Sequence, residues 1–86
     1  MKVGVAGSVE SNDILITVQE SNELVIEITS IVDAFFHDQI EKVIKDTLKE
    51  FNIQNIKVTC QDKGALDYTI KARLVTALTR MEESNA

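Results

Sequence analysis

Three segments of the chain alternate apolar and polar side chains with a period of two residues, which is typical of half-buried β-strands. This alternation predicts strands over residues 13–19, 23–30 and 55–61. Polar, turn-forming residues at Gln19–Asn22 predict a hairpin loop, so we expect the first two strands to pair antiparallel. The run Val3–Ala6 allows an extra N-terminal edge strand. The positions expected to face inward are Ile14, Ile16, Val18, Leu24, Ile26, Ile28, Ile56, Val58 and Cys60.

The apolar period changes to steps of three and four after residue 33, which indicates amphipathic helices. We expect helices over 35–51 and 66–82, the first capped by Asp33 and ended by a left-handed Asn52. The second segment also alternates at its beginning, but its continuity to Met81 favours a helix. The apolar stripes comprise Phe36, Ile40, Val43, Ile44, Thr47, Leu48 and Phe51 in the first helix and Leu66, Ile70, Leu74, Ala77, Leu78 and Met81 in the second, with Lys71, Arg73 and Arg80 facing solvent.

Together these elements predict an α+β fold with the order β-β-α-β-α and allow the extra strand in front. Two helices should cover one face of a small, mainly antiparallel sheet. Truncating a core side chain should then lower the free energy of unfolding substantially, because so short a chain has a small core. The expected core comprises Ile16, Ile26, Ile28, Ile40, Val43, Ile44, Leu48, Val58, Ile70, Leu74 and Leu78.

Length and composition limit what such a fold can do. At 86 residues with 44% hydrophobic side chains, the chain should form one small soluble domain, residues 1–86, without a deep enzyme cleft. It contains no apolar run long enough to span a membrane. A net charge of −5 and few aromatic residues make nucleic acid a poor partner.

The acidity is concentrated at the beginning of the chain. Residues 1–34 hold one basic and six acidic side chains, whereas residues 35–86 hold eight of each. Such a pattern is typical of a solvated sheet face, and it is also compatible with a surface that docks onto basic partners.

Residues that usually carry chemistry are scarce. His37 is the only histidine and Cys60 the only cysteine, so we expect no metal site, no disulfide and no Cys/His catalytic pair. His37 should be a solvated residue near a helix end, and Cys60 a buried, inert thiol. The chain begins without the apolar stretch of a signal peptide, and we therefore expect a cytoplasmic protein.

The segment from Ala6 to Asp13 places two serines, Ser8 and Ser11, in a turn-prone stretch before a strand. As structure, it is a loop whose Ser, Asn and Asp side chains bond the backbone. No general base stands near either serine in the sequence, so we expect neither to be a nucleophile of its own. A serine here could instead be a hydroxyl that another enzyme modifies.

The run Val5–Asp13 (Val-Ala-Gly-Ser-Val-Glu-Ser-Asn-Asp) resembles the N-terminal signature of the citrate lyase acyl carrier proteins, the gamma subunits. There it typically reads Val-Ala-Gly-Thr-Leu-Glu-Ser, a small residue and Asp. The Asp-Lys-Gly-Ala-Leu-Asp run at 62–67 and the basic stretch at 69–74 are similar to a second family motif. The departures are Ser8 for threonine, Val9 for leucine, and Tyr68 where many members carry cysteine.

The resemblance implies a non-catalytic carrier subunit of a lyase complex. In that family the serine after the glutamate, here Ser11, bears phosphoribosyl-dephospho-coenzyme A through a phosphodiester; Ser8 is the less favoured position. The arm's thiol carries acetyl, an alpha subunit (acyl transferase) exchanges it for citryl, and a beta subunit (citryl lyase) releases oxaloacetate. A separate enzyme transfers the prosthetic group.

Two alternatives stay open. The carrier subunit of malonate decarboxylase is similar in size, element order and prosthetic group, although the lysine and leucine within residues 62–67 favour citrate lyase. A small α+β regulatory or assembly module without an arm belongs to another class. For a carrier, we further expect Glu10 and Asp13 to repel the phosphates of the arm and attract basic partner surfaces.

Overall fold

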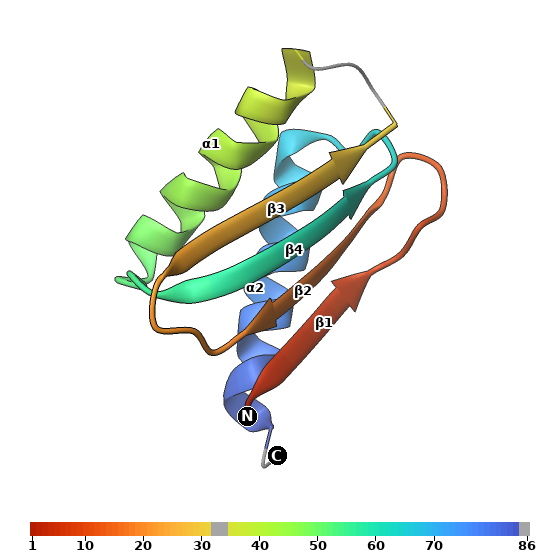
Figure 1. The fold of residues 1–86 in the computed structure, drawn as a ribbon. Helices are drawn as coiled ribbons and strands as arrows, with labels where there is room; N and C mark the ends of the chain where they lie inside the picture. Colours follow the sequence, from red (N-terminus) through yellow and green to blue (C-terminus); the bar gives the residue numbers. More distant parts are fainter. Residues whose placement is uncertain (32–34, 85–86) are drawn as a thin grey trace.

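The computed structural model of the chain describes residues 1–31 and 35–84. Its elements follow the order β-β-β-α-β-α (Figure 1). The predicted α+β class is therefore confirmed, including the extra strand at the beginning of the chain. Each predicted element agrees with the structure to within about one residue at either end. The elements are β1 (Val3–Gly7), β2 (Ile14–Gln19), β3 (Leu24–Ser30), α1 (Phe35–Glu50), β4 (Ile56–Asp62) and α2 (Asp67–Glu83).

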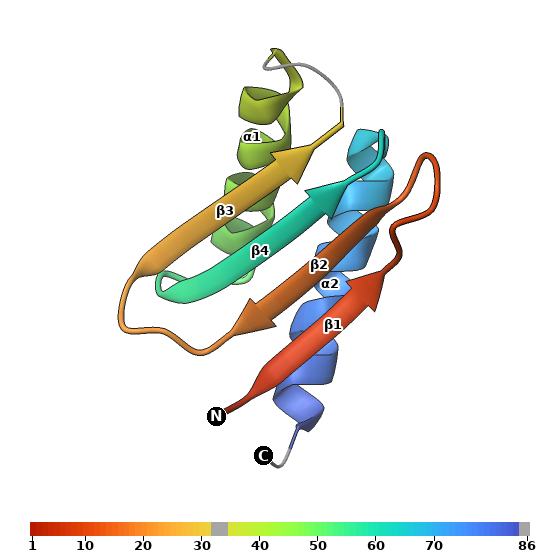
Figure 2. The same ribbon diagram turned by 45° about the vertical axis from the view of Figure 1, so that its right-hand side comes forward.

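The strands form one sheet in the order β1-β2-β4-β3. β1 pairs antiparallel with β2, and β2 pairs antiparallel with β4. β4 pairs parallel with β3, whose connection to it contains α1. The expected hairpin between β2 and β3 is therefore wrong, because β4 lies between these two strands (Figure 2). The sheet is mainly antiparallel, as expected, with one parallel pair.

Burial differs between β4, inside the sheet, and β3, at its edge. The inward side chains of β4, Ile56, Val58 and Cys60, are all buried, opposite the equally buried inward face of β2. In β3, Ile26 and Ile28 are only partly buried, and Leu24, which was expected to face inward, is 42% exposed. The interior position of β4 therefore places its inward face fully in the core, whereas the edge strand β3 contributes less to it.

Both helices lie on the same face of the sheet, as predicted (Figures 1 and 2). α2 packs against β1 and β2, and α1 packs against α2 and β3. Gly4 in β1 lets α2 approach closely, because a Cβ there would lie 1.9 Å from the Ala77 carbonyl oxygen. Eight of the eleven expected core residues are buried, and Ile26, Ile28 and Val43 pack partly buried against them.

Three apolar side chains that the sequence placed on the buried helix stripes are exposed in the structure, because they lie at helix ends. Phe36 in the first turn of α1 is 53% exposed, and Phe51, just past its end, is 50% exposed, so neither belongs to the core. Leu66 precedes α2 as its N-cap and is 59% exposed. Asn52 adopts the expected left-handed conformation with φ 57°. The proposed cap at Asp33 lies outside the described residues.

Candidate functional site

The loop 8–13 connects β1 to β2 at the end of the sheet where β4 turns into α2 (Figure 1). Its backbone is bonded to that turn: the Asn12 N–H donates to the Lys63 carbonyl over 2.8 Å, and the Lys63 N–H donates to the Asp13 carbonyl over 2.9 Å. The two separated sequence motifs are thus brought together at one end of the molecule.

Two residues set the path of the loop. Gly7 has φ 92°, and a Cβ at this position would lie 1.8 Å from the Ile14 carbonyl oxygen, which no side chain could accommodate. Asn12 also has a positive φ, 67°, a conformation that asparagine tolerates better than most residues. The backbone therefore turns sharply at both ends of the segment that contains the serines.

Asp13 is the hub of the loop's hydrogen bonds. Its carboxylate forms a forked ion pair with Arg73 of α2, with Nε to Oδ1 and Nη2 to Oδ2 both at 3.0 Å. Oδ1 also accepts the Ile14 N–H at 2.7 Å, and Oδ2 accepts the Ser8 hydroxyl at 2.8 Å. The Arg73 hydrogen bonds, followed by the Ile14 N–H, lower the pKa of Asp13 to about 2.

This arrangement bears on two sequence-based expectations. Arg73 does not simply face solvent, because its side chain is 43% exposed and paired with Asp13. The same ion pair offsets the charge of Asp13, so we expect less repulsion from Asp13 than from Glu10. The structure also brings a carboxylate to Ser8, but a carboxylate with a pKa of about 2 is too weak a base to activate a hydroxyl.

The two serines differ in their environment. Ser8 is half-buried, and its Oγ donates to Asp13 and accepts the Glu10 N–H at 3.2 Å. Ser11 is exposed near the tip of the loop, and its hydroxyl forms no hydrogen bond with any residue in the described parts of the chain. The backbone around Ser11 is nevertheless held by the bonds of Asn12 and Asp13. The Ser11 hydroxyl is thus accessible on a backbone that is held in place, whereas the Ser8 hydroxyl stabilises the loop through its own hydrogen bonds.

Asp62 supports the same end of the sheet and was not singled out from the sequence. Its carboxylate is buried, accepts the Ser30 hydroxyl at 2.8 Å and the Ala65 N–H at 2.9 Å, and so fixes the turn that carries Lys63. Two signals could have revealed it: its polar side chain at an inward strand position and its place at the beginning of the motif at 62–67. The Asp13–Arg73 pair had no such signal, because its members are 60 residues apart.

The other candidate residues lie elsewhere and suggest no chemistry. His37 is exposed near the beginning of α1, as expected. Cys60 is buried, and desolvation, with a contribution from Asp62, raises the pKa of its thiol to about 12. Among residues 1–31 and 35–84, no group of three or more potential ligands could hold a metal ion. No helix in these ranges is long and apolar enough to cross a membrane.

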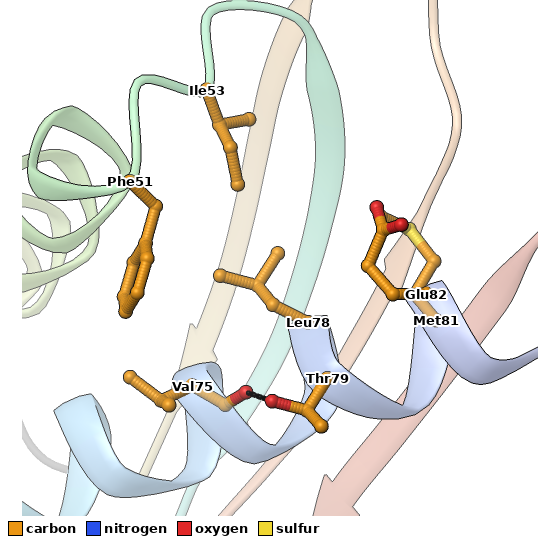
Figure 3. Close-up of a pocket in the computed structure, with 7 residues that line it drawn as sticks. All are labelled: Phe51, Ile53, Val75, Leu78, Thr79, Met81 and Glu82. Carbon is orange, nitrogen blue, oxygen red and sulfur yellow. Dashed lines mark hydrogen bonds between the residues drawn. The ribbon is translucent and has the colours of Figure 1, made fainter.

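An apolar pocket of about 280 Å³ lies between the end of α1 and the second half of α2 (Figure 3). The Phe51 ring points toward Val75, and Ile53 and Leu78 point toward one another across the space. This pocket is at the opposite end of the molecule from the loop 8–13 (Figure 1). It is therefore separate from the serine site.

The comparison with protein families shows that the chain is an acyl carrier subunit. Residues 1–81 match the family described as malonate decarboxylase delta subunit (MdcD). A solved Pseudomonas malonate decarboxylase hetero-tetramer in complex with malonate contains a chain of the same fold, with a TM-score of 0.76 and 17% identity over 95% of this chain and 82% of that chain.

Curated relatives resolve the family further. The chain is 51% identical over 80 residues to the citrate lyase acyl carrier protein of Oenococcus oeni, covering 92% of this chain and 82% of that one. It is 49% identical over 76 residues to that of Halothermothrix orenii, covering 87% and 81%. The chain belongs to the citrate lyase acyl carrier protein family. It is accordingly a carrier subunit that is not itself catalytic, and this family implies a covalently attached prosthetic group.

Proposed function

We propose that residues 1–86 form one acyl carrier domain of citrate lyase and that Ser11 bears its prosthetic group, phosphoribosyl-dephospho-coenzyme A. The thiol of this group would hold acetyl and citryl as thioesters while citrate is cleaved to acetate and oxaloacetate. The observation that carries the assignment of the site is the contrast between the two hydroxyls: that of Ser11 is exposed and has no partner among the described residues, whereas that of Ser8 is hydrogen-bonded.

The chemistry of attachment suits a serine that does not activate itself. The Ser11 Oγ would form a bond to phosphorus of an activated phosphoric anhydride precursor, and the bond from that phosphorus to the bridging oxygen would break. The remaining phosphate chain of the precursor would leave with that oxygen, and the hydroxyl proton would pass to a base of the transferring enzyme. Such an enzyme needs access to the hydroxyl and a backbone that stays in place. The loop offers both, because Ser11 is exposed while Asn12 and Asp13 are bonded to Lys63.

Two partner subunits would use the loaded arm in turn. An alpha subunit would exchange acetyl for citryl and release acetate, and a beta subunit would cleave citryl to oxaloacetate and leave acetyl on the carrier. A flexible arm on a fixed base favours such sequential visits, because tethering gives effective concentrations of order millimolar. We place this carrier in the cytoplasm, where a single buried free cysteine is typical.

The test compares Ser11→Ala with Ser8→Ala by intact mass after incubation with the transferring enzyme and its cofactor precursor. We expect Ser11→Ala to stay unmodified and to abolish citrate cleavage by the assembled complex, and Ser8→Ala to be modified. Modification that persists in Ser11→Ala and disappears in Ser8→Ala would move the site to Ser8. Modification of both variants would place the arm elsewhere.

Native material distinguishes the remaining alternatives. A chain isolated from its host without added mass would favour the armless regulatory or assembly module. A modified chain whose complex turns over malonate and leaves citrate untouched would identify a malonate decarboxylase carrier. We expect added mass and turnover of citrate.

A further inference from the structure

A second pocket, of about 410 Å³, opens directly beside the loop 8–13. It lies where the end of β1 faces the middle of α2, two elements that run side by side (Figure 2). Unlike the apolar pocket at the other end, it is lined mainly by polar and charged side chains. Its lining comprises Ala6, Gly7, Ser8, Glu10, Asp13, Arg73, Thr76 and Arg80.

The wall formed by α2 presents hydrogen-bond donors. Arg73, Thr76 and Arg80 follow one another at intervals of three and four residues and so share a helix face. Arg80 uses Nη1 to bond the Val5 carbonyl at 2.8 Å, and Arg73 uses Nε and Nη2 to bond Asp13. Each guanidinium has five N–H donors, so both retain donors that these bonds do not use. Such forked, permanently charged donors suit a phosphate.

The wall formed by the loop adds an acceptor. Glu10 is exposed, its N–H is held by Ser8, and its carboxylate forms no ion pair or hydrogen bond within the described parts of the chain. Asp13 is already neutralised by Arg73, so Arg80 and Glu10 are the pocket charges without a charged partner in the described residues. A ligand that binds both Arg80 and Glu10 needs an anionic group for Arg80 and, next to it, hydrogen-bond donors for the Glu10 carboxylate. Carboxylates commonly bind the hydroxyl groups of ribose.

We infer that this pocket is a binding site for a ribose phosphate, with the phosphate against Arg80 and Arg73 and the sugar hydroxyls against Glu10. The inference rests on the proposed function, because the prosthetic group attached at Ser11 supplies such a unit. Ser11 directly follows Glu10, with Cα atoms about 3.8 Å apart, so the first groups of an arm on Ser11 begin at the rim of the pocket. The pocket thus holds the base of the arm and leaves its thiol end free.

The experiment uses the unmodified chain and proton–nitrogen NMR, with titrations of ribose-5-phosphate, inorganic phosphate and ribose. We expect saturable shifts of the Gly7, Ser8 and Glu10 amides and of the Arg80 Nε–H with ribose-5-phosphate. Arg80→Gln should weaken binding of ribose-5-phosphate and of phosphate about tenfold, since it removes a charged donor. Glu10→Ala should weaken ribose-5-phosphate alone and leave phosphate binding as strong or stronger.

Lys49→Gln provides a matched control, because it removes the same charge from an exposed site in the last turn of α1, away from the pocket. If Lys49→Gln and Arg80→Gln weakened the binding of ribose-5-phosphate equally, the loss of affinity would be explained by net charge alone. That result would overturn the site. Absence of saturable shifts would overturn it as well. A Glu10→Ala variant with unchanged preference for ribose-5-phosphate over phosphate would overturn the placement of the sugar.

A second variant guards against an effect of Arg80 on folding. Arg80→Lys keeps the charge but not the forked donors, and we expect it to bind both anions less tightly than the unaltered chain and more tightly than Arg80→Gln. Failure of this inference is distinguishable from failure of the proposed function. The titration does not depend on modification, whereas the attachment at Ser11 is read from intact mass.

Discussion

Asp13 and Arg73 lie 60 residues apart in the sequence and meet in a forked ion pair in which both joining distances are 3.0 Å. The pair connects the last residue of the loop 8–13 to the middle of α2. The Asp13 carboxylate is only 15% exposed and accepts two further hydrogen bonds, so it holds the loop against the helix that lines the pocket. The accessible Ser11 is consequently displayed on a loop with a rigid foundation.

This pair should make stability depend on acid. The pKa of Asp13 falls from an ordinary 3.8 to about 2 in the folded chain, chiefly through Arg73, so the unfolded chain takes up the proton first as pH falls. The stabilisation should be fully present above the unfolded value and disappear as pH falls through the folded value. Asp13→Asn should lower the free energy of unfolding by about 1–2 kcal/mol at neutral pH. It should also flatten the acid dependence in urea denaturation. An unchanged acid profile in this variant would contradict the assignment.

Ser8 and Ser11 should differ in stability as well as in modification. Ser8→Ala removes a hydroxyl that bonds Asp13 and the Glu10 N–H, and we expect a loss of about 1 kcal/mol. Ser11→Ala removes an exposed hydroxyl without a partner in the described chain, so its effect should stay within about 0.5 kcal/mol. Chemical denaturation of the unmodified variants measures both. The reverse order would show that the loop bonds are placed incorrectly.

The buried stripe of α1 can be tested with two variants on the same helix. Leu48 is buried, and Leu48→Ala should cost about 2–5 kcal/mol because it leaves a cavity. Phe36 is more than half exposed, and Phe36→Ala should cost much less although it removes a larger side chain. Thermal unfolding should therefore rank the smaller truncation as the more damaging one. Similar costs would mean that Phe36 is part of the core.

Cys60 should report global unfolding. Its thiol is buried and its pKa is raised to about 12, first by desolvation, so almost no thiolate exists at pH about 8. We expect alkylation of the native chain to be slow and to accelerate with denaturant in parallel with unfolding. The same chain in full denaturant is the control. Fast labelling under native conditions would contradict the burial of β4.

Local periodicity was sufficient to predict the elements of this fold and most of the side chains that they bury. Alternation at Ile14, Ile16 and Val18 and at Ile56, Val58 and Cys60 identified two strands whose inward faces are buried in the structure. The three-and-four spacing of Ile40, Ile44 and Leu48 did the same for α1. These patterns are strong because each depends on neighbours that are close in sequence.

The strand order and the hydrogen bonds of the loop 8–13 depend on contacts between residues that are distant in sequence. Local sequence patterns do not specify such contacts. The polar residues at 19–22 indicate a connection between two strands but do not specify which strand β2 pairs with, and β4 lies beside it in the structure. The loop motif pointed to Ser11 only through its resemblance to a family. The bonds that distinguish Ser11 from Ser8 arise from Asp13, whose position is set by Arg73 and Lys63.

The interior place of β4 has a consequence for synthesis on the ribosome. β2 and β3 leave the exit tunnel before β4 (Ile56–Asp62), the strand that lies between them in the folded sheet. Until then each has an unsatisfied edge, and the two could pair with each other or with another nascent chain. The sheet can therefore close only after most of the chain has been made, which favours folding after release and makes the early chain a substrate for chaperones.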